Sequence, residues 1–126
     1  MDTQTSWILL TLGRILLGGL FVFGGVHHFF ILDLLTEVLR KRGVPMPWLV
    51  LIAGSIFQLV AGLLLMLGLF VAPTALGLII FTLAASVMMC NFWNMSGAER
   101  DAMQNVWLSN LAIIGGLLIA ASQATN

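Results

Sequence analysis

The chain has 126 residues, of which 60% are hydrophobic and 8% are charged, and its formal net charge is zero. Soluble domains carry about 25% charged residues, so this composition excludes a soluble globular domain. It indicates that most of the surface of the protein faces lipid. The zero net charge argues against a nucleic-acid partner, and the single cysteine, Cys90, excludes an internal disulfide. The length predicts one domain over residues 1–126.

The first apolar run, from Trp7 to Leu32, predicts a membrane helix near residues 6–31. It is longer than the core of about 7 to 15 residues in a signal peptide, so we expect it to span the membrane. At about 100° per residue, His28 falls on the same line as Arg14, whereas His27 falls well away from it. We therefore expect His28 to face the bundle and His27 to face sideways or toward the headgroups.

The next segment, "LDLLTEVLRKRGVPMPW", has the period of a short amphipathic helix that lies in the membrane interface. After it, residues 43–98 contain no charged side chain. A single helix of that length would be roughly 80 Å long, and a bilayer core is about 30 Å thick. The run must therefore cross twice. Gly68 and Pro73 mark the turn and predict helices near 47–70 and 73–93.

Small residues follow one face of the first and second membrane helices and predict that these two helices pack together. The first stripe contains Gly18 and Gly25 with Phe21 between them, and the second contains Gly54, Ala61 and Gly62 with Gln58 between them.

The last apolar run predicts a fourth membrane helix near 103–122, and Ser96 with Glu99 has the spacing of a capping box before it. Four crossings place the first and third connections on one side, together with Arg40, Lys41, Arg42 and Arg100. The positive-inside rule then predicts that these connections are cytoplasmic and that both termini are outside. The expected fold is an all-α integral membrane four-helix bundle with a short interfacial amphipathic helix between helices one and two.

Several polar residues gather in the cytoplasmic half of this bundle. They are His27, His28, Asn91, Trp93 and Asn105, with Gln58 near mid-membrane and Asn110 a turn or two into the last helix. Lipid offers no hydrogen-bond partner, so we expect a polar, ligand-accepting half. We expect the hydrogen-bond partner of His28 to be Gln58, Asn91 or Asn105. Arg14 lies near the other surface, where it can reach headgroups, bond a neighbouring helix or bind an anion.

The segments "GRILLGGLFVFGGVHHFF", "GVPMPWLVLIAGSIFQLVAGLLLMLGL", "NFWNMSG" and "NVWLSNLAIIGGLLIA" resemble the DoxX family of small four-helix bacterial membrane proteins. Arg14 matches an arginine of the family, and Asn110 matches an asparagine. His28 stands where the family usually has a basic residue, and Gln58 stands where many members have a glutamate. The resemblance implies an association with quinone-dependent sulfur oxidation and other membrane redox complexes.

From these observations we expect an accessory subunit of a membrane redox system in the bacterial inner membrane, with quinone or another lipophilic molecule between its helices. The residues expected to bind it are His28, His27, Gln58, Asn91, Trp93, Asn105, Asn110 and Arg14. Adjacent histidines point about 100° apart on a helix and do not easily share a metal ion. No catalytic triad or intramembrane carboxylate pair is present in the sequence, so we expect no catalytic activity of the chain alone.

Two alternatives remain open beside this reading. One is a non-catalytic scaffold or assembly factor, in which the glycine stripes bind a partner membrane protein or a second copy of the chain. The other is a small carrier for a metal or a lipid. In all three cases the lipid bilayer surrounds the chain.

Overall fold

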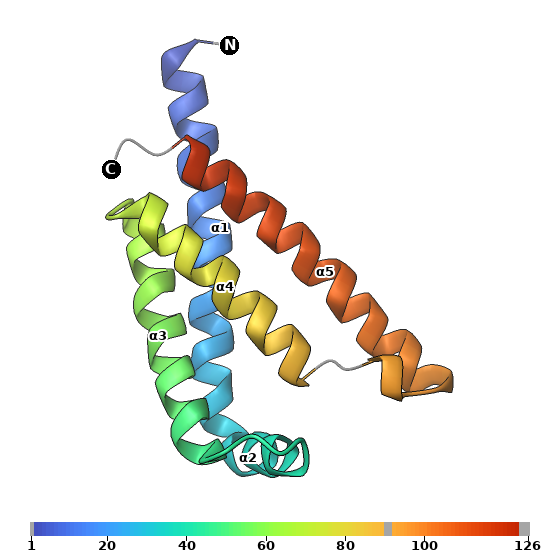
Figure 1. Cartoon of the computed structure of the whole chain (residues 1–126). Helices are drawn as coiled ribbons and strands as arrows, with labels where there is room; N and C mark the ends of the chain where they lie inside the picture. The colour runs from blue at the N-terminus through green and yellow to red at the C-terminus, as the bar shows by residue number, and fades with distance from the viewer. Residues whose placement is uncertain (1, 90–91, 124–126) are drawn as a thin grey trace.

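The computed structural model describes residues 2–89 and 92–123, and these residues are almost entirely helical. The helices are α1 (Thr3–Phe30), α2 (Leu32–Lys41), α3 (Pro47–Leu67), α4 (Val71–Met89) and α5 (Gly97–Ser122), with a short 3₁₀ turn, η1 (Phe92–Asn94), before α5 (Figure 1). By length and composition α1, α3, α4 and α5 can each cross a membrane. The expected all-α membrane architecture with a short helix between the first two spans is confirmed.

Two helices begin earlier than their apolar runs predict. The backbone N–H of Thr5 donates to the Asp2 carboxylate at 2.7 Å, which caps α1 ahead of the apolar run. The same hydrogen bond lowers the pKa of the Asp2 carboxyl from its usual value. At the other end of the chain, α5 begins at Gly97 rather than near residue 103. Ser96 is its N-cap, as its spacing from Glu99 predicts, but the Ser96 side chain makes no capping hydrogen bond, so the expected capping box is not formed. The residues before position 103 were expected to belong to the third connection, but their Ala, Glu, Arg, Met and Gln side chains are strong helix formers.

The turn between α3 and α4 forms where glycine and proline predict it. Gly68 ends α3 in the left-handed conformation with φ of 77°, which a residue without a Cβ adopts at little cost. Pro73 lies in the first turn of α4, where its missing N–H breaks no helical hydrogen bond.

The helices form two antiparallel pairs. The most extensive contact is between α1 and α3, and the next is between α4 and α5. The pairs meet at the end that holds the start of α1, the α3–α4 turn and the end of α5, and they diverge toward α2 (Figure 1). The buried apolar core lies at the end where the two pairs meet. It comprises Phe21, Ala61, Leu65, Val71, Ala75, Leu78, Leu117 and Ala120. At the other end, the space between the pairs is not filled by this core.

Glycines allow the close contact between α1 and α3. A Cβ on Gly18 would collide with the carbonyl oxygen of Gly62, and a Cβ on Gly62 would lie 2.8 Å from the carbonyl oxygen of Gly18. A Cβ on Gly25 would lie 2.8 Å from Leu59 Cγ. The predicted packing of the two stripes is therefore confirmed for these residues. Gly54 departs from the prediction, because it faces the Phe81 ring of α4.

The short helix α2 lies across the wide end of the bundle, against α3 and α4 (Figure 1). Its apolar side buries Leu39, which is 2% exposed. Its polar side carries Glu37 and Arg40, whose side chains form an exposed ion pair at 2.8 Å. This division of apolar and polar sides fits a helix at the boundary between lipid and water.

Candidate functional site

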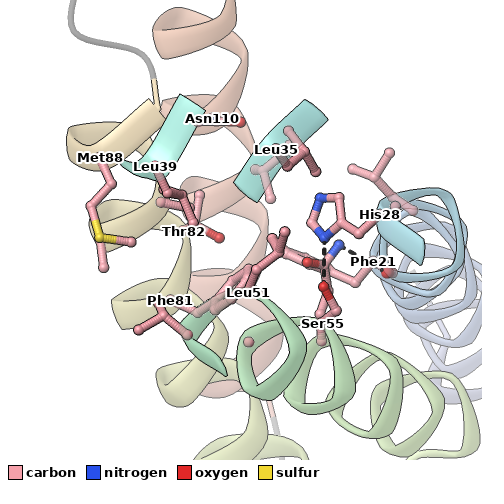
Figure 2. Close-up of a pocket in the computed structure, with 18 residues that line it drawn as sticks. Phe21, His28, Leu35, Leu39, Leu51, Ser55, Phe81, Thr82, Met88 and Asn110 are labelled. Carbon is pink, nitrogen blue, oxygen red and sulfur yellow. Dashed lines mark hydrogen bonds between the residues drawn. The ribbon is translucent and has the colours of Figure 1, made fainter. Parts of the chain in front are cut away.

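A cavity of about 500 Å³ occupies the space where the helix pairs diverge. Small-molecule sites are typically clefts of about 300–1,000 Å³ with mostly apolar walls and a few polar groups. All five α-helices contribute to the lining, which includes Phe21, His28, Leu35, Leu39, Leu51, Ser55, Gln58, Phe81, Thr82, Met88 and Asn110 (Figure 2). The size and the composition of this cavity are therefore those of a ligand site.

His28 of α1 faces this cavity. Its Nδ1 and the Oγ of Ser55 on α3 share a hydrogen bond of 3.0 Å (Figure 2). His27 is exposed and stacks on Phe23, with ring centroids 6.3 Å apart and an angle of 5° between the rings. The prediction that His28 faces the bundle and His27 does not is confirmed.

Among the described residues the partner of His28 is Ser55, which is 1% exposed. The prediction was therefore wrong for Gln58 and Asn105. A helical serine can hydrogen-bond its own backbone, so the sequence carries no signal that Ser55 serves a second helix. Asn91, the remaining candidate, lies outside the described residues.

Gln58 of α3, which also lines the cavity, forms a hydrogen bond to α1. Its Nε2 donates to the backbone oxygen of Phe21 at 3.0 Å, and the residue is 7% exposed. Because a carbonyl oxygen only accepts, this bond settles which end of the amide is nitrogen. The Oε1 atom is buried and accepts no hydrogen bond from any residue that the structure describes.

The opposite wall carries the polar groups of α4 and α5. Thr82 is 6% exposed, and its Oγ1 also lacks a hydrogen-bond partner among the described residues. Figure 2 shows Thr82 and Met88 on the other side of the pocket from His28 and Ser55. Asn110 of α5 donates from Nδ2 to Ser86 Oγ of α4 at 2.7 Å. Thr82 was not among the residues expected to bind a ligand, because threonine is an ordinary residue of membrane helices.

Three of the residues expected to bind a ligand, His28, Gln58 and Asn110, thus line one cavity. The indoles of Trp93 and Trp107 contact each other instead, with ring centroids 6.0 Å apart. Asn105 is exposed on α5. Trp93, Asn105 and the outward-facing His27 do not belong to the cavity lining.

Arg14 lies toward the N-terminal end of α1 and forms a hydrogen bond to the C-terminal end of α3. Its guanidinium donates to the carbonyl oxygen of Leu65 at 3.4 Å and to Thr11 Oγ1 at 3.3 Å, and it lies against Gly68. A cation at a helix C-terminus stabilises the unpaired carbonyls there. Of the roles open to Arg14, the structure shows the bond to a neighbouring helix, away from the cavity.

Arg42 makes a similar contact at the wide end of the bundle. Its guanidinium donates to the carbonyl oxygen of Met88 in the last turn of α4 at 2.7 Å. Arg42 follows α2, so the bond connects α2 to the second helix pair beside the cavity, where Met88 is a lining residue. In the sequence, Arg42 was only one member of a basic cluster that predicts topology.

The first two of the four segments that carry the resemblance lie within a match to the DoxX family as a whole. Residues 9–91 match the DoxX family over well above half of the chain. The chain belongs to the DoxX family. The matched residues cover most of α1 and all of α2, α3 and α4, and they therefore include every cavity-lining residue except those of α5.

A relative of this DoxX protein is inner membrane protein YphA of Escherichia coli (strain K12). The two are 31% identical over 115 residues, which cover 90% of this chain and 81% of the relative. Together with the four apolar helices, this similarity confirms a multi-pass protein of the bacterial inner membrane. No solved structure gives a significant match to the chain.

Metal ligands are not clustered in the described part of this DoxX chain. Among residues 2–89 and 92–123, no three His, Cys, Asp or Glu side chains come together in a group that could hold an ion.

Proposed function

We propose that this DoxX protein is an accessory subunit of a membrane redox system and holds a quinone or another lipophilic molecule in the cavity between its helix pairs. The observation that carries this proposal is the cavity itself. It has a volume of about 500 Å³ and apolar walls, into which separate helices place a few polar side chains. Such walls bind a lipophilic body, and the polar groups orient its head.

The lining suits a quinone ring in particular. A quinone presents two carbonyl oxygens that need hydrogen-bond donors. The His28 imidazole can supply one such donor through a ring nitrogen. Phe81 and Leu51 offer apolar contacts for the ring and its tail. A bound quinone would supply an acceptor for two electrons and two protons. The redox part of the proposal is supported by the family resemblance, and the binding part by the cavity.

The packing of α1 favours this role over a scaffold that binds a partner through glycine stripes. Gly18, Gly25 and Gly62 are already covered by the contact between α1 and α3. A partner helix at these glycines would have to replace α3. Association with another membrane protein through other surfaces is part of the proposed accessory role.

The test is native mass spectrometry of the full chain released from mild detergent. It compares the wild type with a variant in which a phenylalanine side chain occupies the cavity. Ala85 of α4 lines the cavity, so Ala85→Phe places a ring in the ligand volume. Ala53 is exposed on α3 outside the lining, so Ala53→Phe is the matched control. We expect the wild type and Ala53→Phe to carry a small lipophilic molecule, and Ala85→Phe to lose it at an unchanged Tm. A wild type without such a mass, or equal retention by both variants, would contradict the proposal.

A further inference from the structure

Three of the four boundaries between neighbouring helices are held together beside the cavity. The hydrogen bond of His28 joins α1 to α3. Between α3 and α4, the rings of Phe57 and Phe81 are in contact, with centroids 5.8 Å apart. Asn110 joins α5 to α4 through its hydrogen bond to Ser86. Because His28, Phe81 and Asn110 line the cavity themselves, these contacts close three of its sides.

The fourth boundary, between α1 and α5, opens at the level of the cavity. Near the narrow end of the bundle these helices touch, since a Cβ on Gly116 would lie 3.4 Å from Leu17 Cδ1. About one helical turn closer to the wide end, Leu20 and Ile113 line the cavity, and from there the two helices diverge (Figure 1). Leu20 is also 48% exposed. A side chain that belongs both to a cavity wall and to the lipid-facing surface marks an opening.

The boundary between α3 and α4 is the alternative entrance, because Val50 and Ala84 also line the cavity and are exposed. Two contacts obstruct it. The Phe81 ring reaches across to α3, and Arg42 at the end of α2 donates to the Met88 carbonyl oxygen at 2.7 Å. A ligand that entered here would have to displace both contacts.

The short helix α2 covers the end of the cavity at the membrane surface. Leu35 and Leu39 of its apolar side line the cavity, and Leu39 is 2% exposed. A lipophilic molecule that entered past α2 would expose its tail to water, and every methylene moved from lipid to water costs free energy. Entry from the surrounding lipid avoids this cost.

On the basis of the proposed function, we infer that the ligand is a long-tailed amphiphile that enters sideways from the lipid, through the opening between α1 and α5 that Leu20 and Ile113 flank. Its head reaches His28, and its tail remains in the opening. Leu20 and His28 are eight residues apart, or about 12 Å along α1. A tail longer than this distance leaves the cavity past Leu20, so the cavity of about 500 Å³ holds the head without having to enclose the whole tail.

Photo-cross-linking of the full chain in nanodiscs tests this route. The probe is a benzoquinone whose dodecyl tail ends in a diazirine, and the labelled residues are mapped by mass spectrometry. Label that an excess of unmodified dodecylbenzoquinone removes is specific. We expect specific label on α1 and α5 beside Leu20 and Ile113. Leu63 of α3 is 49% exposed and lies outside the lining, so label at Leu63 should survive the excess quinone.

Leu20→Trp places an indole in the opening and should lose most of the specific label, whereas Leu63→Trp, the matched control, should keep it. The wild-type map needs no variant, so it remains decisive if Leu20→Trp does not fold. Specific label confined to α2, α3 or α4, or a wild-type amount in folded Leu20→Trp, would overturn the route while leaving the cavity as a ligand site. The absence of specific label from the whole chain would overturn the proposed function and this inference with it.

Discussion

Gly24 of α1 lies directly against the side-chain amide of Gln58 on α3: a Cβ on Gly24 would be 2.6 Å from Gln58 Nε2. The missing side chain at position 24 leaves the space through which the amide reaches the Phe21 carbonyl oxygen, almost one helical turn earlier. Two features of α1, the missing side chain at Gly24 and the buried carbonyl oxygen of Phe21, therefore hold Gln58 in place at the cavity wall.

This relationship predicts that Gly24→Ala displaces the Gln58 amide. Because Nε2 belongs to a side chain that can move, we expect a loss near the lower end of the about 1–3 kcal/mol typical of overpacking. The measurement is the Tm in detergent. Gly19→Ala on the same helix is the control, because a Cβ there meets nothing within 4 Å. A Tm for Gly24→Ala equal to that of Gly19→Ala would show that the amide does not occupy this space.

A larger loss is expected for Gly62→Ala. Its Cβ would meet the backbone oxygen of Gly18 at 2.8 Å and a methyl carbon of Val22 at 2.9 Å. A backbone yields less than the end of a side chain, so the loss should reach the upper part of the about 1–3 kcal/mol range. The Tm of this variant should fall below that of Gly24→Ala. The reverse order would contradict the α1–α3 packing described above.

At the wide end of the bundle, Arg42→Ala removes the bond from α2 to the Met88 carbonyl oxygen. We expect a loss of about 1 kcal/mol, the usual size for a cation at a helix C-terminus, and faster hydrogen exchange in the last turn of α4. Its neighbour Lys41 is exposed, so Lys41→Ala is the control. Exchange in α4 that is the same in both variants would mean that Arg42 does not hold α4 in place.

The basic residues of α2 and its C-terminal end also predict orientation. We expect the α2 side to be cytoplasmic and both termini to be outside, because Arg40, Lys41 and Arg42 lie on that side. The measurement is labelling of intact cells with an impermeant thiol reagent, in a background without Cys90. Ser122→Cys should react and Ser96→Cys should not. The opposite pattern would reverse the orientation.

Periodicity predicted which helix faces pack together. The glycines of α1 and α3 recur at helical spacing, and only small residues permit backbones to approach that closely. Helical periodicity also predicted that His28 faces the bundle and that His27 does not. These features depend on one helix at a time, which is why the sequence alone carries them.

Features that depend on two helices at once were not predictable in this way. Ser55, Thr82 and Arg42 act through partners on other helices, and nothing in their own segments indicates those partners. Gln58 was one of the expected partners of His28, but it donates to a backbone oxygen, and every helical residue has one. Gly54 belongs to the predicted stripe by spacing and still faces α4, because the direction in which α4 crosses α3 is set by packing rather than by period.

The most direct test of the account compares two adjacent residues. His28 lines the cavity and bonds Ser55, whereas His27 is exposed beside it. Hydrogen bonds between membrane helices average about 0.6 kcal/mol, so His28→Ala should change the Tm only slightly. Its effect on a ligand in the mostly apolar cavity should be larger, because the side chain also orients the head. The measurement is the amount of small molecule retained per protein after purification in mild detergent, scored beside Tm. The account predicts clear loss in His28→Ala and wild-type retention in His27→Ala, and equal retention in the two variants would contradict it.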